Sequence, residues 1–238
     1  MERAILVGAP RKRSAARHLL TEHLEELARL ADTAGAEVVG EVTQLLDRPS
    51  PATYLGKGKP EELRHRVADI GATLVIFDDE LSPTQGKNIE LELGTRVMDR
   101  AELILDIFAT RARTSEAKMQ VELAELEYML PRLARMWTHL EKTRGGIGLR
   151  GPGETQIETD RRLIRHRIKI LREPLEDVRR SREVQRAGRR DAFKVSLVGY
   201  TNAGKSSILR SLASASDIFV EDRLFATLDP LTREVALG

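Results

Sequence analysis

Apolar positions in the first part of the chain follow two alternating patterns. Four short apolar clusters predict strands, at residues 4–7, 38–42, 73–77 and 103–108. Three segments with apolar residues at helical spacing, each followed by a glycine, predict helices over residues 14–34, 61–70 and 83–93. Strands that alternate with helices predict an α/β fold, with a small parallel α/β subdomain over residues 1–112.

A heptad pattern of apolar residues dominates the middle of the chain. Spacings of four and three alternate in two segments, Met119, Leu123, Leu126, Leu130, Leu133, Trp137 and Leu140, and then Ile164, Ile168, Leu171, Leu175 and Val178. This spacing predicts two helices that pack antiparallel as a helical hairpin over residues 113–190. Pro131 and Pro174 should kink or divide these helices. The alternative interpretation is ordinary core packing of both segments against the first subdomain.

A glycine-rich stretch at residues 144–154 separates the two expected helices. Five of its glycines fall within nine residues, which prevents regular structure. Thr155 and Glu158 match a capping box, so the second helix should begin at Thr155. The stretch is either a flexible connector or an RNA contact at the tip of a basic hairpin. On the second interpretation, the candidate RNA-binding residues are Arg144, Gly146, Arg150, Gly151 and Gly153.

The motif with the clearest chemistry is G-x-x-x-x-G-K-[ST] at residues 199–206. An expected strand over residues 193–198 precedes it and a helical pattern follows, which is the context that a phosphate loop requires. Backbone amides of such a loop face a phosphate, Lys205 reaches the β- and γ-phosphates, and the Ser206 hydroxyl is a ligand of Mg²⁺. The candidate phosphate-binding residues are Gly199, Tyr200, Thr201, Asn202, Ala203, Gly204, Lys205 and Ser206.

A second candidate nucleotide segment follows at residues 224–230. In GTPases, a switch segment at this place contributes one threonine to Mg²⁺ and the γ-phosphate, and Thr227 is our choice for this role. Thr232 is the alternative, although it fits better with a following strand expected over residues 233–237. The candidate residues of the segment are Phe225, Ala226, Thr227, Leu228 and Asp229, with Ser206 and Thr227 as the metal ligands. No catalytic residue can be assigned.

Composition and charge bear on the compartment and the partner. The chain has no cysteine, and none of its apolar runs reaches the length of a signal peptide or a membrane span. We therefore expect a cytoplasmic protein, and a monomer. The net charge of +2 hides a basic segment at residues 161–190, which carries +8 and leaves −6 for the rest. A basic segment on an otherwise acidic protein predicts an anionic partner.

Several stretches together resemble the HflX family of ribosome-binding GTPases. They are residues 54–59, 75–80, 103–108, 120–124, 151–156, 199–206 and 224–230. The resemblance implies an N-terminal domain, made of an α/β subdomain and a helical hairpin, and a G domain that binds GTP or GDP with Mg²⁺. It also implies that the hairpin loop contacts rRNA of the large ribosomal subunit, and that GTP controls the dissociation of stalled or idle ribosomes.

The sequence contains only the phosphate half of a GTPase site. After Thr227 there is neither a D-x-x-G segment for the γ-phosphate nor an N-K-x-D segment for the guanine base, so residues 191–238 form an incomplete P-loop G domain. We interpret the chain as a truncated form and expect weak nucleotide binding without turnover. Two alternatives stay open, a nucleotide-independent rRNA-binding module with a vestigial phosphate loop and a P-loop ATPase of another class.

Overall fold

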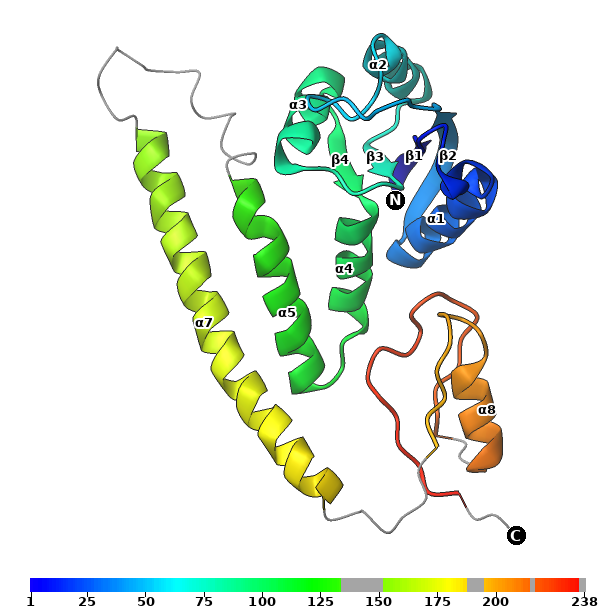
Figure 1. The fold of residues 1–238 in the computed structure, drawn as a ribbon, viewed down its shortest axis with the longest axis vertical. Coiled ribbons are helices and arrows are strands. Elements are labelled where there is room, and N and C mark those ends of the chain that lie inside the picture. The colour runs from blue at the N-terminus through cyan, green and yellow to red at the C-terminus, as the bar shows by residue number, and fades with distance from the viewer. Residues whose placement is uncertain (134–151, 188–194, 215–216, 236–238) are drawn as a thin grey trace.

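A parallel sheet forms the centre of the N-terminal subdomain. The computed structural model describes residues 1–133, 152–187, 195–214 and 217–235. Four strands, all parallel to their neighbours, have the order β2-β1-β3-β4 (Figure 1). They are β1 (Glu2–Gly8), β2 (Ala36–Thr43), β3 (Leu74–Phe77) and β4 (Arg96–Asp99). The predicted fold class, α/β with a small parallel subdomain followed by an antiparallel helical hairpin, is confirmed by this sheet and by the two long helices described below.

Helices cover both faces of this sheet, because successive side chains of a strand point to opposite sides. The subdomain's helices are the short 3-10 helix η1 (Ala15–Arg17), α1 (Leu20–Ala34), α2 (Lys59–Ile70), α3 (Pro83–Leu93) and α4 (Arg100–Arg111). On one face, α1 and α4 pack against Leu6 and Ile76. On the other face, α2 and α3 pack against Val7 and Phe77. The subdomain therefore has three layers and two apolar clusters.

The strand predicted over residues 103–108 is wrong, because these residues form the middle of α4. The Asp99 carboxylate accepts a hydrogen bond from the Glu102 amide at 3.0 Å and so caps the helix. Leu103 and Ile107, one helical turn apart, are both buried in the core. A short apolar run fits a strand and a buried helix equally well, and here the cap that precedes it decides. The fourth strand, which the sequence analysis missed, is β4, and its last residue is the capping Asp99.

The helical hairpin consists of α5 (Ser115–Met129) and α7 (Pro152–Ala187), which run antiparallel (Figure 1). Ile168 and Leu171 of the second heptad segment are buried, and α7 packs against α5. α5 also packs against α4, so it lies between the α/β subdomain and α7. Both interpretations of the heptad pattern therefore hold in part. Trp137 and Leu140 lie outside the described residues.

The two prolines of the hairpin have different effects. Pro131 lies in a 3-10 turn, η2 (Leu130–Arg132), directly after α5, whereas Pro174 is accommodated inside α7. α7 begins at Pro152, so the predicted start at Thr155 is wrong and the expected capping box lies inside the helix. Proline suits a first helical turn because it has no amide hydrogen to leave unpaired and its φ is already helical.

The predicted RNA-binding residues fall mostly outside the part of the chain that the structure describes. Gly153 was expected in the glycine-rich loop but lies in the first turn of α7. The other candidates, Arg144, Gly146, Arg150 and Gly151, lie outside the described residues.

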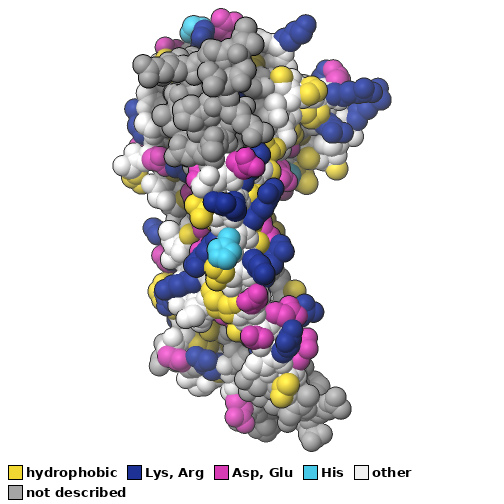
Figure 2. Space-filling view, turned by 90° about the vertical axis from the view of Figure 1, so that its left-hand side faces the viewer, with side chains coloured by type: hydrophobic (Ala, Val, Ile, Leu, Met, Phe, Trp, Pro, Cys, Tyr) yellow, Lys and Arg dark blue, Asp and Glu magenta, His cyan; other side chains and the backbone are white. Residues whose placement is uncertain are grey.

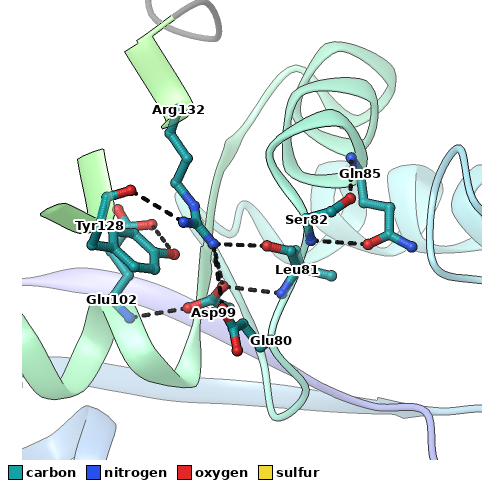
Figure 3. Close-up of polar contacts among 8 residues, drawn as sticks. All are labelled: Glu80, Leu81, Ser82, Gln85, Asp99, Glu102, Tyr128 and Arg132. Carbon is teal, nitrogen blue, oxygen red and sulfur yellow. Dashed lines mark hydrogen bonds and ion pairs between the residues drawn. The ribbon is translucent and has the colours of Figure 1, made fainter. Parts of the chain in front are cut away.

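Arg132 joins the end of the first hairpin segment to the edge of the sheet (Figure 3). Its guanidinium donates hydrogen bonds to the carbonyls of Leu81 at 2.8 Å and Tyr128 at 3.1 Å, and lies 3.5 Å from a carboxylate oxygen of Asp99. Asp99 is buried and also accepts hydrogen bonds from the amides of Leu81 and Glu102, both at 3.0 Å. This Arg132 cluster fixes the C-terminal end of α5 relative to β4 and α4.

The C-terminal part rests on the α/β subdomain. Its one helix among the described residues is α8 (Lys205–Leu212). The prediction of a strand over residues 193–198 is wrong for residues 195–198, the part that the structure describes. These residues have no regular structure and are exposed. A strand needs a neighbour for its backbone groups, and within the described ranges none lies beside it. The strand expected at residues 233–237 is also absent from residues 233–235, the part of it that the structure describes.

No helix in the described ranges is long and apolar enough to cross a membrane.

Candidate functional site

The loop before α8 leaves the N-terminus of that helix open. Asn202 and Gly204 have positive φ values of 56° and 84°, which turn the backbone sharply before the first helical residue, Lys205. No side chain caps the helix at Gly204. The first amides of α8 and the positive end of its dipole can therefore face an anion.

The hydroxyls of Ser206 and Thr227 lie together at this helix end. Their oxygens are 3.1 Å apart, within hydrogen-bond distance. Adjacent ligands of an octahedral Mg²⁺, each about 2.1 Å from the ion, are about 3.0 Å from each other. The two hydroxyls therefore fit neighbouring coordination positions of one magnesium ion. Thr232, the alternative threonine, is exposed and makes no contact of this kind within the described residues.

A pocket surrounds these hydroxyls and unites most of the predicted nucleotide-binding residues. Those that line it are Thr201, Asn202, Ala203, Gly204, Lys205, Ser206, Phe225, Ala226 and Thr227. Lining residues that the sequence did not predict are Ser207, Val220, Glu221 and Arg223. The predicted residues outside the lining are Gly199, Tyr200, Leu228 and Asp229. The structure therefore brings the phosphate loop and the downstream segment to one place.

Side-chain hydrogen bonds hold the downstream segment on the phosphate loop. The Phe225 amide donates to the Thr201 hydroxyl at 2.8 Å, and the Asn202 amide group donates to the Asp222 carboxylate at 2.7 Å. The Lys205 ammonium donates to the Tyr200 carbonyl across the loop. This bond keeps the positive charge of Lys205 within the loop, where a bound phosphate would meet it.

The same segment is anchored on α4. The rings of Phe225 and Phe108 meet edge to face, with their centroids 4.9 Å apart. Leu224 is buried in the apolar cluster that α1 and α4 share. Arg111, in the last turn of α4, donates a hydrogen bond to the Glu221 carboxylate at 3.0 Å. The α/β subdomain therefore holds the segment that forms one side of the candidate site.

Tyr200 turns from the loop toward the α/β subdomain and begins a chain of polar contacts. Its hydroxyl donates to the Glu26 carboxylate, Glu26 pairs with Arg100 at 2.6 Å, and Arg100 pairs with Asp78 at 2.9 Å. Burial opposes ionisation of Glu26, but hydrogen bonds from Arg100 and Tyr200 outweigh it, so the pKa of Glu26 lies below its ordinary value. The bond to Glu26 also raises the pKa of Tyr200. Sequence reasoning missed this contact because its partners are 174 residues apart.

Carboxylates of α5 partly neutralise the basic segment of α7. Arg167 and Arg172 each approach a carboxylate, of Glu122 and Glu127 respectively, at 2.6 Å. In Figure 2, which faces α7, dark blue Lys and Arg side chains follow the helix with magenta acidic side chains between them. The outward face is therefore basic but carries less net positive charge than the sequence of residues 161–190 alone suggests.

A phosphate loop open at a helix N-terminus, preceded by a parallel α/β subdomain and a helical hairpin, defines the class of P-loop nucleotide-binding proteins. Models of GTP-binding GTPases match residues 21–109 (N-terminal) and 111–189 (middle region), and a model of the 50S ribosome-binding GTPase matches residues 194–238. The chain is 49% identical over 236 residues to the GTPase HflX of Flavobacterium psychrophilum and 50% identical over 216 residues to that of Escherichia coli. It belongs to the HflX GTPase family.

The similarity covers nearly all of this chain but only part of each relative. It extends over 99% of the chain and 57% of the Flavobacterium protein, and over 90% and 50% for the Escherichia protein. The chain spans about half the length of the curated relatives it matches. Solved structures of a GTP-binding protein from Sulfolobus solfataricus with GDP and of an SsGBP–GDP complex give TM-scores of 0.52 and 0.54 at 27% and 26% identity. The alignments cover 90% and 94% of this chain and 54% and 60% of those chains.

Proposed function

We propose that this chain is part of a protein that binds guanine nucleotide with Mg²⁺, hydrolyses GTP and acts on the large ribosomal subunit. The observation that carries the proposal is the pair of hydroxyls of Ser206 and Thr227, which lie 3.1 Å apart at the open N-terminus of α8. A nucleotide phosphate with its magnesium ion has the charge and the ligand geometry that suit this arrangement. The GDP in the similar Sulfolobus structure supports guanine over adenine.

Each part of the pocket has a proposed role toward the nucleotide. Lys205 and the amides at the start of α8 would hold the phosphates. Lys205 brings a positive charge to the pocket, and the uncapped amides bring hydrogen-bond donors to the same place. Ser206 and Thr227 would hold Mg²⁺, which neutralises charge on the phosphate oxygens when it is bound. Thr227 would add its contact in the triphosphate state, as switch threonines do.

The proposed partner of the hairpin is rRNA of the large ribosomal subunit, and the proposed outcome is GTP-controlled dissociation of ribosomes. The basic outward face of α7 supports an anionic partner, and the model matched by residues 194–238 is that of a 50S ribosome-binding GTPase. Arg144, Gly146, Arg150, Gly151 and Gly153 are the proposed loop contacts. We further propose that the protein acts in the cytoplasm as a monomer.

Co-sedimentation with purified large ribosomal subunits tests this function. We expect a non-hydrolysable GTP analogue to raise the bound fraction of the wild-type chain but not that of Lys205→Ala, because Lys205 contacts the nucleotide in our proposal. An ATP analogue in place of the GTP analogue is the control for base preference. Binding that is the same with and without nucleotide would favour the second candidate function, a nucleotide-independent rRNA-binding module, for which the basic face of α7 would suffice.

A further inference from the structure

The residues that follow Thr227 lie on the first turn of α5. Leu228 packs against the small apolar cluster formed at the beginning of that helix. The Asp229 carboxylate accepts one hydrogen bond from the Thr114 hydroxyl and a second from the Arg113 amide at 3.3 Å. The threonine that meets the phosphate loop is therefore followed directly by two residues anchored on the hairpin.

The same turn of α5 is also the base of the hairpin. The Thr114 hydroxyl caps α5 by accepting a hydrogen bond from the Ala117 amide at 3.1 Å. Glu116, in the same turn, accepts a hydrogen bond from Arg182 of α7. One helical turn thus contacts α7 on one side and the segment that carries Thr227 on the other.

We propose that Asp229 is a positioning residue that ties Thr227 to the first turn of α5, so that the magnesium site and the base of the hairpin are energetically linked. The inference rests on the proposed function, because that function assigns Thr227 to Mg²⁺. Asp229 does not line the phosphate pocket, so its effect on the nucleotide acts through Thr227. Linkage is reciprocal: a displacement of the hairpin base changes Mg²⁺ affinity, and bound nucleotide with Mg²⁺ stabilises the hairpin base by the same factor.

Amide hydrogen exchange of the 238-residue chain tests the anchoring role. The Phe225 amide is the probe, because its bond to the Thr201 hydroxyl at 2.8 Å reports whether the segment stays on the phosphate loop. Asp229→Ala should raise the exchange rate of this amide about tenfold, since it removes a charge-assisted pair of hydrogen bonds. Asp217→Ala is the matched control: it also removes a paired carboxylate, but the Asp217 side chain is 68% exposed, so water screens its 2.7 Å pair with Arg233 and the pair contributes little.

Two variants of the hydroxyl partner complete this experiment. Thr114→Ser keeps the hydroxyl and should retain the wild-type exchange rate, whereas Thr114→Val should raise it. In the double variant, the effects of Thr114→Val and Asp229→Ala should be less than additive, because both substitutions remove the hydrogen bond between these two side chains. Equal rates in the wild type and Asp229→Ala, or fully additive effects, would overturn the inference.

The Mg²⁺ dependence of GTP-analogue binding separates positioning from mere structural support. Asp229→Ala should need about tenfold more Mg²⁺ for half-maximal binding, whereas Asp217→Ala and Thr114→Ser should follow the wild type. If Asp229→Ala raised the exchange rate of the Phe225 amide but left the Mg²⁺ dependence of binding unchanged, Asp229 would only support the local structure, and the inference would be overturned. If the wild type bound no nucleotide at any Mg²⁺ concentration, the proposed function would fail, and the exchange rates would still decide whether Asp229 anchors the segment.

Discussion

At the scale of single residues, the site depends on which threonine faces the phosphate loop. Thr227 and Thr232 are both compatible with the sequence, but only Thr227 lies beside Ser206, with 3.1 Å between their hydroxyl oxygens. The backbone reason is local, since Phe225 has a positive φ of 55° and turns the chain back toward the loop. The metal-binding role of Thr227 is therefore open to a direct comparison of the two threonines.

Thr227→Val should raise the Mg²⁺ concentration needed for binding of a GTP analogue at least about tenfold, because valine keeps the size of the side chain and removes the ligand oxygen. Thr232→Val is the matched control and should leave the Mg²⁺ requirement unchanged. Titration of Mg²⁺ at fixed analogue concentration measures both. The opposite ranking of the two variants would move the switch role to Thr232.

Glu26 gives the phosphate loop a pH-dependent attachment to the α/β subdomain. Its pKa is lowered in the folded chain, so the ionised form is favoured by folding. The stabilisation is therefore complete above the ordinary glutamate pKa of 4.5 and is lost as the pH falls below it, through the folded-state pKa.

Glu26→Gln should lower the free energy of unfolding by about 1 kcal/mol at pH 7 and by progressively less as the pH approaches 3.5. Urea unfolding at a series of pH values measures this difference. The control is Glu25→Gln, because Glu25 is exposed on the same helix turn. A constant difference between Glu26→Gln and the wild type across this range would contradict the assignment of the charge to Glu26.

At the scale of helices and strands, the Arg132 cluster decides how the hairpin meets the sheet. Arg132→Met should lower the free energy of unfolding by about 2–4 kcal/mol, because it removes hydrogen bonds to two carbonyls and leaves the buried Asp99 carboxylate without its cation. The matched control is Arg167→Met, because the Arg167 side chain is 51% exposed and its pair with Glu122 should contribute less than about 1 kcal/mol. Denaturant unfolding distinguishes them, and equal losses would contradict the account.

Elements whose stability is local could be predicted from the sequence, and elements that depend on distant partners could not. The heptad spacing predicted the hairpin, and the glycine-lysine-serine motif predicted the loop before α8. The run at residues 103–108 was assigned to a strand because its apolar pattern is ambiguous, while the deciding Asp99 cap lies outside it. The expected strand before the phosphate loop has no neighbouring strand among the described residues. The contact of Tyr200 with Glu26 depends on tertiary packing that no local pattern encodes.

At the scale of the whole molecule, the hairpin combines a basic outward face with internal charge pairs to α5. Arg165 and Lys169 are exposed on α7, whereas Arg167 is paired with Glu122. Binding of large-subunit rRNA should weaken steeply with salt, because counterions are released when phosphates are bound. Replacement of both Arg165 and Lys169 by glutamine should reduce the slope of log affinity against log salt by about 1–2.

Fluorescence anisotropy with labelled large-subunit rRNA, over a range of salt concentrations, measures this slope. The control is Arg167→Gln, which removes a charge already balanced by Glu122 and should change the slope less. A salt-independent affinity, or an identical slope for the double variant and the wild type, would contradict a phosphate-binding role for the face of α7.

The whole account depends on a phosphate loop that binds nucleotide through Lys205 and a bound magnesium ion. The most direct measurement is calorimetric titration of GDP with Mg²⁺ into the 238-residue chain and its Lys205→Ala variant. We predict measurable binding by the wild type and none by the variant, because Lys205 contacts the phosphates in our proposal. Equal binding by both proteins, or none by either, would contradict the account.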